Sequence, residues 1–111
     1  SVYFPTLEQY RCNPALIISA AQGEQVKAAV AGRVVRIYED AVTGKTVVMD
    51  LGNGYELTYG QLADVTVSEG SYVPAGENFA VIASPTRYFV EEGTNLYLKL
   101  TKDGVAVNPA Q

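Results

Sequence analysis

The chain has 111 residues, 48% hydrophobic and 18% charged, which fits one soluble domain over residues 1–111 with a single core. Its net charge of −4 disfavours nucleic acid and anionic membrane surfaces as partners, and no apolar run approaches the roughly 20 residues of a membrane span. The chain contains no histidine and one cysteine, Cys12, so it lacks an internal disulfide and the usual histidine routes to zinc hydrolysis and acid–base catalysis.

Residues 1–25 show no clean hydrophobic period, whereas the chain from residue 26 onward predicts an antiparallel all-β fold with little helix. Short β-rich runs alternate there with turn residues at intervals of about ten. We expect VKAAV at 26–30 and RVVRIYE at 33–39 to be two strands joined by a tight turn at Gly32.

Two further hairpins are predicted from turn sequences of the Asn-Gly and Asp-Gly type. GNG at 52–54 joins TVVMD to YELTY, and KDG at 102–104 joins LYLKL to VAV. In the last long strand, strict alternation places Leu96 and the other leucines in the core, and Asn95, Tyr97 and Lys99 on the opposite face.

One long polar loop, SPTRYFVEEGT at 84–94, breaks the rhythm of strands and turns. It carries two aromatic residues, Tyr88 and Phe89, and loops of this length in compact domains are often functional or mobile. We take it as a candidate interaction loop, with a plain exposed connection as the alternative.

The order of these motifs resembles the LytM-type peptidoglycan endopeptidases of peptidase family M23, over roughly residues 7–109. The family's scaffold landmarks are a V-x-A-x-x-x-G-x-V strand pair, a G-x-G hairpin before Y-x-H-L, a V-x-x-G-x-x-V-x-x-G segment, and a final D-G-x-x-x-N-P. The matching stretches of this chain are VKAAVAGRVV, GNGYELTYGQL, VSEGSYVPAG and DGVAVNP. The resemblance implies a LytM-type antiparallel sandwich of hairpins.

The same resemblance places other residues where the family has its active-site groups. The zinc ligands of the family come from H-x-x-x-D and from the second histidine of H-x-H, and these positions hold Asn13, Ile17 and Tyr97. The two remaining active-site histidines correspond to Gln61 and Asn95. The resemblance implies that all five side chains line one vestigial groove.

None of these replacements is a good zinc ligand, so we expect a domain without a metal, a cofactor or peptidase activity. An isoleucine has no donor atom, amides bind zinc weakly, and a tyrosine would have to ionise at an unperturbed pKa of about 10. Without zinc, nothing in the motif lowers the pKa of a water molecule to about 7. The groove is then either an amide-rich binding site, or a relic in which Gln61 and Asn95 hydrogen-bond to each other.

The resemblance implies a protein–protein interaction module in a cell-envelope protein of a Gram-positive bacterium, most similar to the stage II sporulation protein Q type. Such proteins pair with a ring-building sporulation partner, lie outside the cytoplasm and are anchored by an N-terminal membrane segment, which this sequence lacks. Edge strands and loops would be the docking surface.

Three alternatives remain open. The domain is a non-catalytic peptidoglycan-binding module, or it regulates cell-wall amidases in the envelope. The third alternative is a biotinyl or lipoyl carrier domain with Lys45 as the modified lysine, but its flanking sequence TGKT differs from that of carrier motifs.

Overall fold

The computed structural model describes residues 15–108, and this part of the chain is almost entirely β-structure. Its elements are β1 Leu16–Ser19, β2 Gln25–Lys27, β3 Gly32–Asp40, β4 Gly44–Gly52, β5 Tyr55–Ala63, β6 Tyr72–Val73, β7 Asn78–Ile82, the 3₁₀ helix η1 Arg87–Phe89, β8 Asn95–Lys102 and β9 Val105–Val107. Every strand pair is antiparallel, which confirms the predicted all-β class. None of the described elements is a helix that could cross a membrane.

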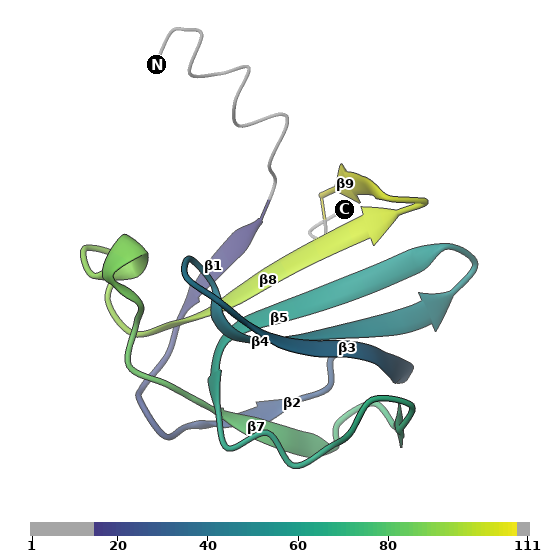
Figure 1. Cartoon of the computed structure of the whole chain (residues 1–111), viewed down its shortest axis with the longest axis horizontal. Helices are drawn as coiled ribbons and strands as arrows, with labels where there is room; N and C mark the ends of the chain where they lie inside the picture. The colour runs from purple at the N-terminus through teal and green to yellow at the C-terminus, as the bar shows by residue number, and fades with distance from the viewer. Residues whose placement is uncertain (1–14, 109–111) are drawn as a thin grey trace, which may run out of the picture.

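Six of the strands follow one another across one sheet in the order β1-β8-β5-β4-β3-β6. Strand β1 pairs with the first half of β8, and β9 pairs with its second half on the same side. The two short strands therefore share the outer edge of β8. Strand β7 pairs with the end of β5 and with β2, and this pair lies below the long strands in Figure 1. The sheet therefore folds over, and the core lies between its long strands and the β2–β7 pair.

A bulge in β5 produces this fold-over. Lys45 of β4 pairs with Leu62, but Val47 pairs with Tyr59, so two residues of β5 lie opposite one residue of β4. One of the two, Gln61, has a φ of 65°, in the left-handed region that non-glycine residues rarely adopt. Because a bulge bends its strand, β5 leaves its neighbours there and continues beside β7.

Tyr59 lies at the centre of the core. Its ring packs edge-to-face on Phe79 with centroids 4.8 Å apart, and its hydroxyl accepts a hydrogen bond of 2.9 Å from the Ala29 N–H. The leucines of β8 pack against the same core, as their alternation predicted. The buried core consists of Val26, Ala28, Val34, Val47, Met49, Leu57, Tyr59, Leu62, Val73, Phe79, Ala80 and Ile82.

The β4–β5 and β8–β9 hairpins are confirmed. Asn53 and Gly54 have φ angles of 56° and 83°, and Asp103 and Gly104 have φ angles of 51° and 82°. Two consecutive residues with positive φ are the mark of the two-residue turn that matches strand twist, which explains why these sequences predicted the hairpins.

The predicted hairpin around Gly32 is wrong. Strand β2 pairs with β7 rather than with β3, and Gly32 is a buried residue inside β3. A Cβ atom at Gly32 would lie 3.0 Å from the Asp50 carbonyl oxygen and from the Leu51 side chain. This glycine therefore permits the close approach of β4 and has no role in a turn.

Candidate functional site

A polar groove of about 350 Å³ crosses β3, β5 and β8 on the sheet face opposite the core leucines. Period-2 alternation along β8 brings Tyr97, Lys99 and Thr101 into this groove, because the leucines between them point the other way. Among the other residues of its wall are Arg36, Tyr38, Asp40 and Thr58. The groove thus combines two phenols, hydroxyls and charges of both signs.

Tyr97 lies at the end of the groove, between the sheet and the 84–94 loop. Its ring meets that of Phe89 edge-on, with centroids 6.1 Å apart, and its Cβ would lie 3.2 Å from a Cβ placed on Gly60. Burial raises the pKa of the Tyr97 phenol above its ordinary value of 10, and nearby Tyr38 and Asp40 raise it further. The phenol is therefore neutral at physiological pH.

Ile17 is the cross-strand partner of Tyr97 in the β1–β8 pair, so the two side chains lie on the same face. Its side chain is exposed and offers only carbon atoms. Two positions predicted to be catalytic relics are therefore direct neighbours, although neither provides a ready metal ligand.

Gln61 is buried and does not line the groove, and both ends of its side-chain amide hydrogen-bond to backbone groups. Its Nε2 donates to the Val42 carbonyl at 3.1 Å, and its Oε1 accepts from the Thr86 N–H at 3.1 Å. Its own N–H donates to the Thr43 carbonyl at 2.6 Å. The amide therefore joins the β3–β4 turn to the 84–94 loop.

Asn95 is also buried, and its side-chain partner is not Gln61. Its Nδ2 donates to the Gly93 carbonyl at 2.7 Å, whereas its Oδ1 has no hydrogen-bond partner among the described residues. The predicted mutual hydrogen bond of the two amides is therefore wrong: the Gln61 amide bonds to Val42 and Thr86, and the Asn95 amide bonds to Gly93.

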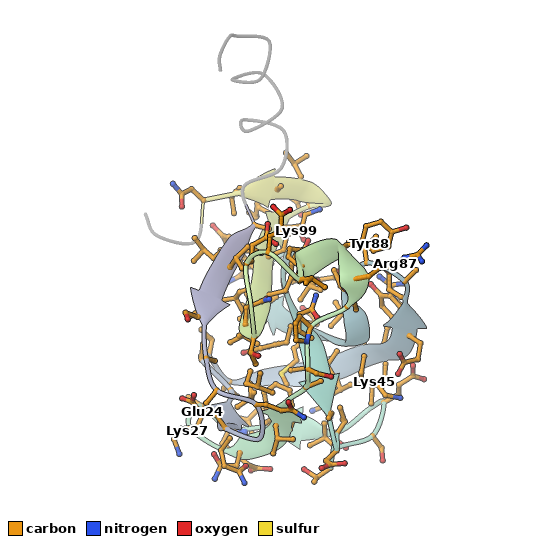
Figure 2. The ribbon with its side chains drawn as sticks, turned by 90° about the vertical axis from the view of Figure 1, so that its left-hand side faces the viewer. Glu24, Lys27, Lys45, Arg87, Tyr88 and Lys99 are labelled. Atoms are coloured by element: carbon orange, nitrogen blue, oxygen red, sulfur yellow. The ribbon has the colours of Figure 1, made fainter. Side chains whose placement is uncertain are left out.

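The two aromatic residues of the 84–94 loop have different environments. Tyr88 is 54% exposed at the surface beside Arg87, as Figure 2 shows, while Phe89 is half-buried against Tyr97. The Thr86 hydroxyl donates to the Val42 carbonyl at 2.6 Å, next to the hydrogen bonds of Gln61. The loop is thus fixed near Thr86 and presents Tyr88 to solvent.

The described residues do not fit the zinc ion that the predicted correspondence would bring. No group of three His, Cys, Asp or Glu side chains gathers anywhere in residues 15–108, and Asn13 lies outside that range. At the predicted positions, Ile17 has no donor atom and the Tyr97 phenol resists ionisation. Gln61, at the position of one of the other active-site histidines, has an amide oxygen that already accepts a backbone hydrogen bond.

Sequence reasoning did not find most of the groove wall. Tyr38 and Asp40 alternate along the end of β3, and this period of two could have placed them on one face. The alternation could not have predicted that Tyr38 and Asp40 share a groove with β8. That arrangement depends on the order of the strands, in which β4 and β5 lie between β3 and β8.

The model of peptidase family M23 matches residues 11–109, so the chain belongs to this family. The antiparallel β-fold described above is therefore the fold of an M23-family domain.

Two curated relatives and one solved complex are similar to the chain. It is 34% identical to the murein hydrolase activator EnvC of Escherichia coli over 85% of its length, and 30% identical to stage II sporulation protein Q of Bacillus subtilis over 76%. It spans only 22% and 29% of those relatives' lengths. A chain from a crystal structure of the SpoIIIAH and SpoIIQ complex superposes with a TM-score of 0.71 at 29% identity, covering 78% of this chain and 59% of that one.

Proposed function

We propose that this M23-type domain is catalytically inactive and serves as a protein–protein interaction module in a cell-envelope protein. The observation that carries the proposal is the state of Gln61, whose amide is committed at both ends to backbone groups of the fold. A side chain in that state is not available to assist water attack. The positions of Ile17 and Tyr97 add no zinc ligand that could activate the water.

The relatives support a protein partner. One is named as an activator of murein hydrolases, and the other has been crystallised in complex with SpoIIIAH. By analogy with them, we assign this domain to an extracytoplasmic part of a longer, membrane-anchored chain, with a sporulation partner as the first candidate and regulation of cell-wall amidases as the alternative.

The groove supports peptidoglycan binding as a second candidate function. Its hydroxyl groups and the half-buried Tyr97 ring offer hydrogen bonds and packing area, which suit a glycan or a short peptide. This binding would not require any of the missing zinc ligands.

Co-sedimentation with purified peptidoglycan sacculi tests both candidates against each other. The wild type would be compared with Tyr97→Ala, which removes the groove aromatic, and with Tyr72→Ala, which removes a tyrosine that is 58% exposed and outside the groove. Soluble protein in every arm would favour the protein-interaction module. Pelleting that only Tyr97→Ala abolishes would favour the peptidoglycan module.

The claim of inactivity has its own assay. Sacculi incubated with the domain and added zinc should release no new amino termini, while a catalytic M23 enzyme in a parallel sample should release them. Any zinc-dependent release by the wild-type domain would overturn the proposal.

A further inference from the structure

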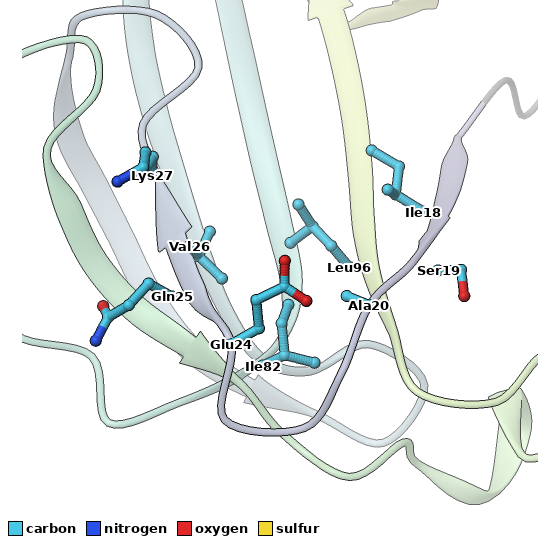
Figure 3. Close-up of a pocket in the computed structure, with 9 residues that line it drawn as sticks. All are labelled: Ile18, Ser19, Ala20, Glu24, Gln25, Val26, Lys27, Ile82 and Leu96. Atoms are coloured by element: carbon cyan, nitrogen blue, oxygen red, sulfur yellow. The ribbon is translucent and has the colours of Figure 1, made fainter.

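A second pocket, of about 130 Å³, lies at the open end of the core between β1 and β2 (Figure 3). Its walls are aliphatic side chains from four strands and from the residue after β1: Ile18, Ala20, Val26, Ile82 and Leu96. It is separate from the groove, because the two share no lining residue.

One carboxylate points into this apolar pocket. Figure 3 shows the Glu24 side chain directed into the space between β2 and β8, whereas the Lys27 amine points away. The Glu24 Oε1 accepts a hydrogen bond of 3.0 Å from the Ala21 N–H, and its other oxygen has no partner among the described residues. The Lys27 amine donates to the Asn78 Oδ1 at 3.2 Å. The pocket therefore has, among its aliphatic walls, one exposed carboxylate with unused acceptor capacity.

Strand β1 beside the pocket is an edge strand without the usual protection. It ends the sheet, it pairs with β8 alone in the described chain, and its sequence LIIS has no charge and no proline. Ile17 and Ile18, on opposite faces, are 39% and 43% exposed. Natural edge strands are usually blunted by charges, prolines or bulges, so an apolar and unblocked edge favours pairing with another strand.

We propose that β1 and the adjoining pocket form a docking surface for an extended strand of a partner protein that carries a lysine. The partner's backbone pairs with the edge of β1 that faces no other strand within residues 15–108, and its lysine enters the pocket beside Ile18. The methylene groups of the lysine pack on Val26 and Leu96, and its ammonium group meets the free oxygen of Glu24. The inference rests on the proposed interaction function and adds the site and the chemistry of the partner.

Charge complementarity decides in favour of a basic side chain. An acidic side chain would face Glu24 and the net charge of −4, and a purely aliphatic one would bury the carboxylate without a partner. A lysine, with an aliphatic stem and a cationic end, satisfies both the apolar walls and the carboxylate.

The test uses blocked peptides and methyl-labelled full-length chain in NMR titrations. The probe is Thr-Val-Lys-Val-Thr, and its matched control has norleucine in place of lysine, which keeps the methylenes and removes the charge. The lysine peptide should shift the methyl signals of Ile18, Ala20 and Leu96. Its affinity should exceed that of the norleucine peptide by about threefold to fivefold, the range of a partly screened ion pair.

The variant Glu24→Gln should abolish the difference between the two peptides, while Glu39→Gln, the same change at an exposed site on β3, should preserve it. Equal affinity for both peptides in the wild type would overturn the proposal, and this arm needs no variant that could misfold. Shifts confined to the methyl signals of Thr58 and Thr101 in the groove, or none at millimolar peptide, would also overturn it. These negative results would not contradict the proposed function, which the sacculus and cleavage assays test separately.

Discussion

The side chain of Gln61 holds two loops of this fold together. Its amide accepts from the Thr86 N–H and donates to the Val42 carbonyl, both at 3.1 Å, while its backbone adopts a φ of 65°. A residue in this strained region persists only where its surroundings fix it, and these hydrogen bonds provide that constraint.

Replacing Gln61 with alanine should lower the free energy of unfolding by about 2 kcal/mol, because Thr86 loses a part-buried acceptor and the loop loses its link to Val42. Urea denaturation measures the loss, and hydrogen exchange at Thr86 should accelerate. Gln25→Ala, at an exposed position of β2, is the control and should change stability by less than about 0.5 kcal/mol. Equal stability of the two variants would contradict the assigned role of Gln61.

Ionisation of Tyr59 should lower the stability of the fold at alkaline pH. Burial raises the pKa of its phenol above the ordinary value of 10, although the hydrogen bond from the Ala29 N–H acts in the opposite direction. A folded-state pKa above the unfolded one means that stability is complete below about pH 10 and falls as pH rises toward the folded value.

Tyr59→Phe should therefore cost about 1 kcal/mol at neutral pH, through the lost acceptor for Ala29, and the cost should shrink above pH 10. Denaturation series between pH 7 and pH 11 measure it. Tyr72→Phe, at a 58% exposed position, should leave the whole profile unchanged. A constant difference between wild type and Tyr59→Phe across this range would show that the phenol does not control the alkaline limit.

At the scale of elements, the sequence predicted the hairpins whose turns depend on only two residues each. Asn-Gly and Asp-Gly turns require positive φ at both central residues, so the β4–β5 and β8–β9 hairpins could be located from four residues. Strand β1 and the β2–β7 pairing could not be found, since β2 has only three residues and its partner follows about fifty positions later. Its pairing depends on the bend in β5, which no turn motif marks.

Gly60 shows how one element constrains another. A Cβ atom here would lie 3.0 Å from the Thr43 carbonyl oxygen and 3.2 Å from the Tyr97 Cβ. The missing side chain thus lets the β3–β4 turn and β8 approach the bulge of β5 from two sides.

Gly60→Ala should destabilise the fold by about 1–3 kcal/mol through overpacking and should shift the ring signals of Tyr97. Gly76→Ala is the comparison, because nothing lies within 4 Å of its Cβ position and only its φ of 85° opposes the change. It should cost about 1 kcal/mol and leave Tyr97 unaffected. Unchanged Tyr97 signals in Gly60→Ala would mean that the β3–β4 turn at Thr43 moves to make room for the new methyl group and that Tyr97 does not.

At the scale of the whole molecule, the candidate site was predictable only as a set of positions. The family resemblance predicted that Asn13, Ile17, Gln61, Asn95 and Tyr97 line one groove. The burial of those that the structure describes depends on long-range packing. No local pattern in the sequence distinguishes the exposed Ile17 from the buried Asn95.

The proposed loss of the zinc site can also be tested by putting the family's ligand residues back into this fold. Because Ile17 and Tyr97 are cross-strand partners, Ile17→Asp and Tyr97→His would bring a carboxylate and an imidazole side by side. With Asn13→His added at the third ligand position that the family resemblance predicts, the triple variant should bind zinc at micromolar concentration or tighter, measured by equilibrium dialysis and metal analysis, while the wild type should not.

The matched control moves the aspartate by one residue. Ile18→Asp replaces Ile17→Asp in the same triple variant, and strand alternation turns that carboxylate to the opposite face from Tyr97, so zinc affinity should fall by at least tenfold, to about the level of a two-ligand site. Hydrolysis should not return in either variant, because Gln61 and Asn95 still lack a basic nitrogen and a bound zinc alone does not supply the proton transfers. Equal zinc binding by both triple variants would show that the family's ligand positions do not map onto Ile17 and Tyr97.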